Sequence, residues 1–117
     1  TMNICLTPYA STILDIIAAS ASLSNETGFI TGRDIGHFRI VDNLIPIAFN
    51  ESSIDEVYSQ VFHHLGEKLL GVFFNNREPF SCDWFMENII LMIKSSRPDF
   101  FLYGADHTFT PLILEKD

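Results

Sequence analysis

The sequence predicts an α+β fold, an α/β mixed sheet flanked by helices, in a single domain over residues 1–117. Two observations support this prediction. Segments with helical periodicity alternate irregularly with short runs of β-branched and aromatic residues, and neither a linker nor a repeat divides the chain. In addition, 47% of the 117 residues are hydrophobic and 11 are Phe, which is enough for one small core. The expected order of elements is β-α-β-β-(β)-α-β-α-β-β.

The first half of the chain predicts a strand, a helix and a hairpin. Residues 3–6 (NICL) form a short run that favours an opening strand. Thr7 is suited to cap the next helix and Pro8 to begin it, because the missing N–H of proline has no intrahelical partner at that position anyway. Residues 29–41 predict a hairpin, since two runs rich in β-branched and aromatic residues flank RDIG, and residues 44–49 extend the sheet.

The second half predicts two helices and three strands. Residues 52–66 carry their apolar side chains on a single stripe, as expected of an amphipathic helix. Residues 68–74 (KLLGVFF) are apolar on both faces and predict a central strand. Residues 83–96 predict the last helix. Two final strands are expected at residues 99–104 and 108–115.

This order, together with two sequence blocks, resembles the MPN domain family, also called JAB or JAMM, whose fold is cytidine-deaminase-like. ETGFITGRDIGHFRIVDNLIP (residues 26–46) is similar to a family block with a Glu, two following Gly and a hairpin. GEKLLGVFFNN (residues 66–76) is similar to the helix end and strand that precede the family's histidines. The resemblance covers roughly residues 3–104. It implies an MPN/JAB-like domain, related to zinc-dependent isopeptidases that act on ubiquitin-like proteins.

In active members of that family two His and one Asp bind zinc, and a Glu activates the attacking water. Glu26 matches the Glu. Phe74 and Asn76 stand where the two His are expected, with Asn75 between them and Arg77 at the place of a Pro. Phe cannot bind zinc and Asn is a poor ligand for it. The resemblance therefore implies a pseudoenzyme that has lost its metal and uses no cofactor.

The remaining family positions lead to the same expectation. Ser81 aligns with the family's Ser, whereas Asp83 lies one residue early and Trp84 occupies the ligand position. Glu26, Ser81 and Asp83 are thus interpreted as relic positions without a catalytic role. Glu26 is also explained as an ordinary loop residue before Gly28.

Two other kinds of site, a relocated zinc site and a cysteine nucleophile, receive less support. A relocated zinc site would have to use His37, His63, His64 and His107, yet adjacent helical residues such as His63 and His64 point about 100° apart. Cys82 lies near an expected helix start, which can lower a thiol pKa, but no His is near it in the sequence. We therefore expect no catalytic residue and no metal ligand.

A protein-binding role is the expectation that remains. The expected last helix is apolar nearly all round, which favours an interface. The loop NNREPFSCDW (residues 75–84) would form a second contact surface at the mouth of the former cleft. The predicted partner-binding residues are Phe74, Asn75, Asn76, Arg77, Phe80, Trp84 and Phe85.

The composition limits the classes of partner that the chain is expected to bind. A net charge of −8 with only 7 Lys and Arg argues against nucleic acid. One candidate partner is a homologous subunit or a ubiquitin-like protein, in a homo- or heterodimer. The alternative is a basic toxin such as a nuclease, which would make the chain an immunity or antitoxin protein. A metal-dependent isopeptidase with unconventional ligands is the weakest alternative. Neither a signal peptide nor a membrane span is visible, so a cytoplasmic location is expected.

Overall fold

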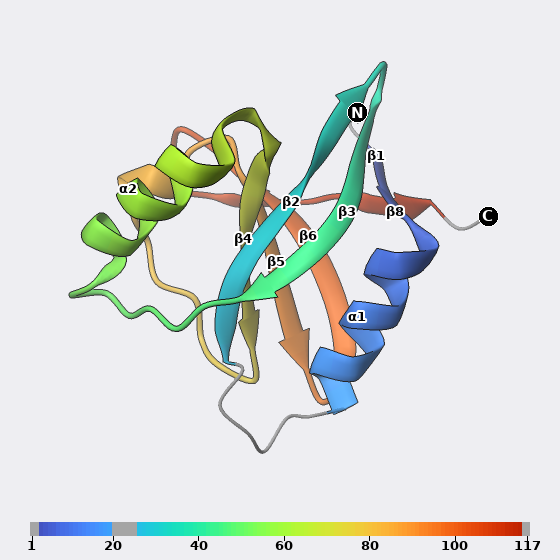
Figure 1. The fold of residues 1–117 in the computed structure, drawn as a ribbon, viewed down its shortest axis with the longest axis horizontal. Coiled ribbons are helices and arrows are strands. Elements are labelled where there is room, and N and C mark those ends of the chain that lie inside the picture. Colours follow the sequence, from blue (N-terminus) through green and yellow to red (C-terminus); the bar gives the residue numbers. More distant parts are fainter. Residues whose placement is uncertain (1–2, 20–25, 116–117) are drawn as a thin grey trace.

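A single twisted sheet dominates the molecule, and two helices pack against it (Figure 1). The computed structural model describes residues 3–19 and 26–115. In this part of the chain the helices are α1 (Pro8–Ala19) and α2 (Ile54–Leu65), with the 3₁₀ turns η1 (Gly66–Lys68) and η2 (Asp83–Phe85). The strands are β1 (Asn3–Leu6), β2 (Thr27–Ile35), β3 (Phe38–Pro46), β4 (Leu69–Asn75), β5 (Ile89–Lys94), β6 (Arg97–Tyr103), β7 (Phe109–Pro111) and β8 (Ile113–Glu115).

The eight strands lie in the order β7-β6-β5-β4-β2-β3-β1-β8, so β7 and β8 occupy opposite edges of the sheet. Only Leu112 separates these two strands in the sequence. β7 pairs antiparallel with β6, and β8 pairs parallel with β1. One extended segment, residues 109–115, therefore joins the two edges and closes the sheet into a barrel-like shape, and Figure 1 shows this segment crossing behind the other strands. The Asn3 side-chain amide donates a hydrogen bond of 2.7 Å to the Glu115 carboxylate across the join.

The first elements confirm the predicted opening strand, the start of the first helix and the hairpin, whereas the extension of the sheet predicted at residues 44–49 ends at Pro46. The Thr7 hydroxyl accepts a hydrogen bond of 3.1 Å from the Ala10 amide, and α1 begins at Pro8. β2 and β3 form the expected hairpin, and its turn lies at Gly36 and His37, where Gly36 adopts a φ of 60° that suits glycine. Among the described residues no helix is both long and apolar enough to cross a membrane.

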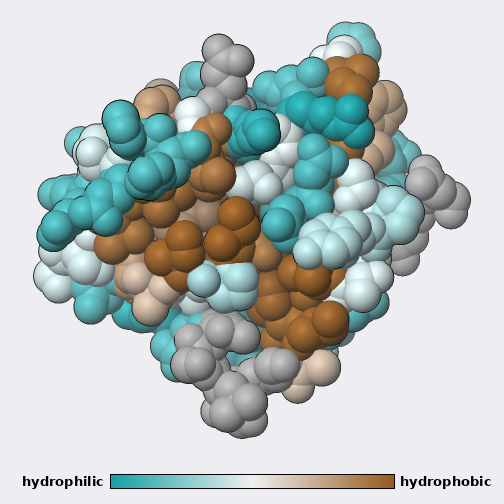
Figure 2. Space-filling view, viewed as in Figure 1, coloured by the Kyte–Doolittle hydropathy of each residue, from teal (hydrophilic) through white to brown (hydrophobic). Residues whose placement is uncertain are grey.

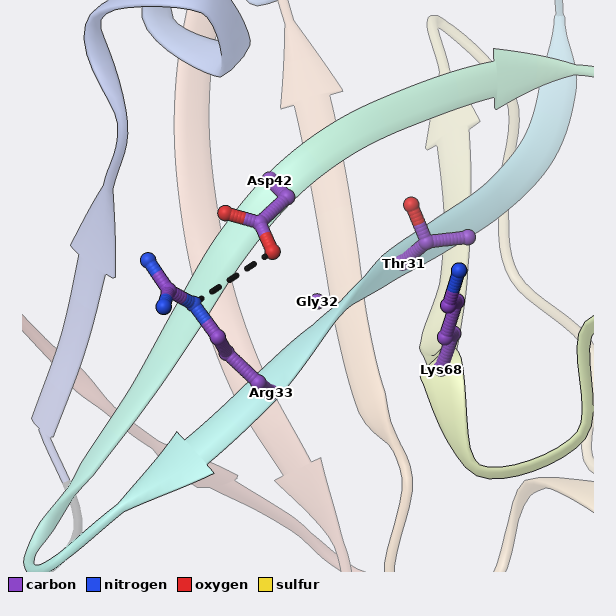
Figure 3. A pocket seen from close by; sticks show the side chains of 5 residues that line it. All are labelled: Thr31, Gly32, Arg33, Asp42 and Lys68. Atoms are coloured by element: carbon purple, nitrogen blue, oxygen red, sulfur yellow. Dashed lines mark ion pairs between the residues drawn. The ribbon is translucent and has the colours of Figure 1, made fainter.

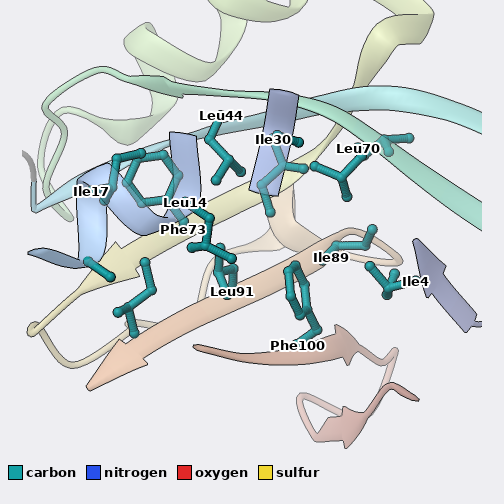
Figure 4. Packing of buried hydrophobic residues seen from close by; sticks show 14 residues of the cluster. Ile4, Leu14, Ile17, Ile30, Leu44, Leu70, Phe73, Ile89, Leu91 and Phe100 are labelled. Carbon is teal, nitrogen blue, oxygen red and sulfur yellow. The ribbon is translucent and has the colours of Figure 1, made fainter. Parts of the chain in front are cut away.

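The core has two parts, one on each face of the sheet. Along β4 successive side chains alternate between them, because neighbouring residues of a strand point to opposite faces. Phe73 belongs to the cluster beneath α1, which Figure 4 shows together with Leu14, Ile30 and Leu91. Val72 and Phe74 belong to the cluster beneath α2. On this side of the molecule the outer surface of α2 is hydrophilic, and hydrophobic residues gather below the helix (Figure 2). The central strands are thus buried on both faces, which explains their nearly continuous apolar sequence.

The predicted fold class, an α+β MPN/JAB-like (cytidine-deaminase-like) domain with a helix at residues 83–96, is wrong. That stretch forms the short turn η2 followed by β5, so the described chain has two α-helices instead of three. β5 pairs parallel with β4 and antiparallel with β6. Its side chains are apolar on all sides because a central strand buries both faces, and the run Ile89–Ile90 provides the β-branched residues that favour a strand. The closed eight-stranded sheet also departs from the simple helix-flanked sheet that we expected.

The close contact between β4 and β5 gives a test of this arrangement. A Cβ added at Gly71 would lie 1.9 Å from the carbonyl oxygen of Ile89, which is backbone and cannot turn away. We expect Gly71→Ala to lower the free energy of unfolding by about 2–3 kcal/mol, as measured by urea denaturation. Gly36→Asn is the control, because a Cβ at Gly36 meets nothing within 4 Å and Asn tolerates a positive φ. A Gly71→Ala protein as stable as the Gly36→Asn protein would contradict this pairing.

Candidate functional site

Phe74, at the place of the first family histidine, lies inside an aromatic cluster. Its side chain is fully buried. Its ring centroid lies 5.7 Å from that of Phe49, 5.5 Å from Phe80 and 6.2 Å from Phe85. The geometry of these pairs is edge-to-face, which aromatic rings favour. This part of the supposed cleft is therefore filled by packed rings.

The two asparagines that follow Phe74 hold the end of β4 in place. Asn75 is buried, and its side-chain amide donates a hydrogen bond of 2.9 Å to the carbonyl of Ile17 in α1. Asn76 is exposed, has a φ of 53°, and its side-chain oxygen accepts a hydrogen bond of 3.0 Å from the Ser95 amide. Both side chains thus bind protein backbone, and each joins β4 to a different neighbouring segment.

Glu26, which the resemblance matched to the family's Glu, lies beside a cation. Its carboxylate is 3.7 Å from the Arg77 guanidinium, which also donates a hydrogen bond of 3.3 Å to the carbonyl of Phe49. Ser81 and Asp83 lie exposed in the following loop and at the start of η2. No group of three or more His, Cys, Asp or Glu residues in the described part of the chain could hold a metal ion.

Trp84 lies on the surface, where its side chain makes a hydrogen bond and a ring contact. Its side chain is 41% exposed, and its indole N–H donates a hydrogen bond of 2.7 Å to the Asp55 carboxylate in α2. Its ring centroid is 4.9 Å from that of Tyr58, which in turn stacks on Phe62 at 6.4 Å with 12° between the planes. Phe62 is 53% exposed. We name these four residues, Asp55, Tyr58, Phe62 and Trp84, the Trp84 surface.

Three carboxylates act on the thiol of Cys82, which lies two residues before Trp84 in the sequence. The pKa of Cys82 is raised above its ordinary value, first by burial and then by the negative charges of Asp55, Asp83 and Glu51, although a hydrogen bond with the Trp84 backbone opposes the shift. Burial likewise raises the pKa of the Tyr58 hydroxyl. Three acidic side chains are therefore close enough to influence one thiol. This environment keeps the thiol protonated at neutral pH, the opposite of what a nucleophilic cysteine needs.

The structure separates the seven predicted partner-binding residues into two groups. Three are buried and pack inside the molecule: Phe74, Asn75 and Phe85. The other four are at least partly exposed: Asn76, Arg77, Phe80 and Trp84. The surface on the expected last helix is absent, because Ile89, Ile90 and Leu91 are fully buried in β5. Sequence reasoning missed Asp55 and Phe62, whose place in the helical periodicity suggested only an amphipathic helix.

Comparison with known proteins supports the fold and gives no information about function. No family model matches the chain, and no curated protein matches it. Among solved structures, the solution structure of Protein DSY2949 from Desulfitobacterium hafniense is similar, with a TM-score of 0.58 and 18% sequence identity over 97% of this chain and 94% of that one. At this identity the likeness concerns the fold alone. The resemblance of residues 26–46 and 66–76 to the MPN/JAB family stays a prediction.

Restoring the two imidazoles is a direct test of the aromatic packing. We expect the double variant Phe74→His, Asn76→His to bind no zinc and to cleave no isopeptide bond. A His at position 74 would lose the ring contacts and bury a polar group, which should cost roughly 2–4 kcal/mol of stability. Zinc content, isopeptidase assays and urea denaturation measure these outcomes. The single variant Asn76→His is the control and should cost about 1 kcal/mol or less. Zinc-dependent cleavage by the double variant would contradict the expectation.

The acidic surroundings of Cys82 predict slow alkylation. Because its pKa is raised, less thiolate is present at neutral pH, and iodoacetamide should modify Cys82 more slowly than an unperturbed thiol. Asp55→Asn removes one of the negative charges and should speed the reaction by a factor of roughly 2–3. Mass spectrometry of the peptide that contains Cys82, as a function of pH, measures both rates. A half-maximal rate at a pH clearly below about 8 would contradict the expectation.

Proposed function

We propose that this chain is a non-catalytic protein-interaction module that binds a basic segment of a partner protein on the Trp84 surface. The observation that carries the proposal is the exposed Trp84 ring, which the 2.7 Å hydrogen bond to Asp55 and the packing on Tyr58 hold in one orientation. A tryptophan that is fixed before binding loses little conformational freedom when a partner arrives. Trp is also among the residues that most often dominate binding energy at interfaces.

The chemistry of the Trp84 surface favours a cationic partner. The faces of Trp84 and Phe62 can accept a Lys or Arg side chain through cation–π contact. Asp55, with Asp83 and Glu51 near Cys82, supplies carboxylates that can pair with the same cations. The net charge of −8 would attract such a partner from a distance and speed its association.

The non-catalytic part of the proposal rests on the residues at the end of β4. Phe74 packs among aromatic rings, Asn75 and Asn76 bind backbone, and Glu26 lies beside Arg77. Each of these four residues therefore has a packing, hydrogen-bonding or ion-pairing role within the molecule. The former cleft is not proposed as the binding surface, because its side chains at 74, 75 and 85 are buried.

Two kinds of partner fit the proposal. A basic toxin, for example a nuclease, is favoured by the charge, and the chain would then be a small acidic immunity or antitoxin protein. A homologous subunit or a ubiquitin-like protein is favoured only by the resemblance to the MPN/JAB family. The neighbouring gene would distinguish them, since a toxin gene points to the first and a gene for a ubiquitin-like protein points to the second. The weakest alternative, an isopeptidase with unconventional ligands, requires about one transition metal per purified chain.

Trp84 is the single tryptophan of the chain, so its fluorescence reports directly on the proposed surface. We expect an Arg-rich peptide to change this fluorescence in a saturable way and a Glu-rich peptide of equal length to leave it unchanged. With the natural partner, identified by pull-down and mass spectrometry, Trp84→Ala should cost about 2 kcal/mol, or roughly thirtyfold in Kd, by calorimetry.

The matched control is Tyr9→Ala, which removes another exposed aromatic side chain, at 61% exposure, from α1. This variant should bind the partner with unchanged Kd. Equal affinity of the Trp84→Ala and unmodified proteins, or an equal fluorescence response to both peptides, would contradict the proposal.

A further inference from the structure

A different feature of the sheet, the break in strand pairing at Thr31, has the properties of a ligand site. On one side of β2, Thr31 pairs with Asn43 and Gly32 with Val41, so Asp42 is an extra residue of β3. On the other side, Ile30 pairs with Gly71 and Thr31 with Leu69, which leaves one extra residue in β4. β3 and β4 thus each carry a bulge opposite the same point of β2. Bulges redirect side chains and are common beside functional sites.

Gly32 makes this arrangement possible. A Cβ at this position would lie 1.9 Å from the carbonyl oxygen of Ile40 and 2.8 Å from a methyl carbon of Leu70. The neighbouring strands therefore occupy the space that a side chain at position 32 would need. The Ile40 backbone, on the β3 side, and the Leu70 side chain, on the β4 side, therefore fix the position of the break.

A cavity of about 330 Å³ lies at this break, and its size falls within the range of small-molecule sites (Figure 3). Thr31, Gly32, Arg33, Asp42 and Lys68 line it. Thr31 is only 7% exposed, although it is polar. Figure 3 shows the Lys68 side chain extending beside Thr31, while Arg33 and Asp42 lie on the other side of Gly32. The Arg33 Nε atom is 3.5 Å from the Asp42 carboxylate.

The charge of this cavity contrasts with that of the whole chain. The described side chains of its lining include two cations and one carboxylate, a formal charge of +1, in a protein of net charge −8. Two of the 7 Lys and Arg residues are thus gathered at one break in the sheet. Arg33 is already engaged by Asp42, whereas Lys68 presents its ammonium group next to a hydroxyl-bearing side chain.

We propose that this cavity binds a small molecule through an oxyanion, a carboxylate or a phosphate group, held by the Lys68 ammonium and the Thr31 hydroxyl, with Arg33 in support. Lysine ammonium and hydroxyl groups are common donors to such oxygens, and a charged donor shortens and strengthens the hydrogen bond. The Arg33 and Asp42 side chains are 60% and 43% exposed, so binding is screened by salt and lies in the millimolar range for an isolated anion.

Amide chemical shifts from ¹H–¹⁵N spectra of the full chain test the site, with inorganic phosphate and acetate as separate probes. We expect a saturable shift of the Thr31, Gly32 and Lys68 signals, and the probe with the lower Kd identifies the class of oxyanion. Added sodium chloride should weaken the binding. Absence of saturation with both probes, or shifts centred on other segments, would overturn the proposal.

Two variants should act in opposite directions. Lys68→Ala removes a donor and should raise Kd by about fivefold or more. Asp42→Asn removes the carboxylate found among the described side chains of the lining and releases Arg33, so Kd should fall by about threefold or more. Lys94→Ala is the control, because this exposed lysine pairs with Glu78 at 2.9 Å and does not line the cavity. An unchanged Kd in Lys68→Ala, or a raised Kd in Asp42→Asn, would refute the site.

Discussion

The pairing of one short segment with both edges of the sheet is the constraint on which the rest of the structure depends. Residues 109–111 bind β6 and residues 113–115 bind β1, so both outer strands find hydrogen-bond partners in a single stretch of chain. An open sheet of this length would expose unpaired N–H and C=O groups at two edges. Closure satisfies many of them, and it also encloses a space that side chains must fill.

The cluster on the α2 face of the sheet connects the core to the proposed binding surface. It contains aromatic rings, among them Phe49, Phe74 and Phe85, and these rings extend outward through Tyr58 to Trp84. The buried rings supply apolar area for stability. The outermost ring keeps two-fifths of its surface exposed and is anchored by a carboxylate. The aromatic rings of the core and of the Trp84 surface are therefore in continuous contact. Packing against the core holds the Trp84 surface in place.

Local signals in the sequence were sufficient for most strands but not for the topology. Thr7, Pro8 and the turn at Gly36 act through hydrogen bonds and backbone angles within a few residues, so their roles could be predicted. Residues 89–94 could not be assigned in this way, because a run that is apolar on all sides suits a buried helix and a buried strand equally. Partners far away in the sequence, β4 and β6, decide between the two.

The same limit applies to the candidate sites. Trp84 stood out by residue type, but its hydrogen bond to Asp55 spans 29 residues and leaves no mark in the local pattern. The cavity at Thr31 depends on bulges in β3 and β4 at once, and these arise from pairing between segments distant in the sequence. The resemblance to the MPN/JAB family placed Phe74 and Asn76 at the end of a strand. It did not show that the Phe74 side chain packs inward, or that the Asn76 side chain accepts a hydrogen bond from the Ser95 amide.

The join between Asn3 and Glu115 also has a consequence for how fast the molecule forms. These two side chains are 112 positions apart in the sequence, and β1 cannot complete its pairing until β8 reaches it. Contacts between such distant residues require a large loss of chain entropy before they return any stabilisation, so proteins rich in them fold slowly. Until that late step the partly folded chain presents a bare strand on each side, and during this interval it is most exposed to aggregation.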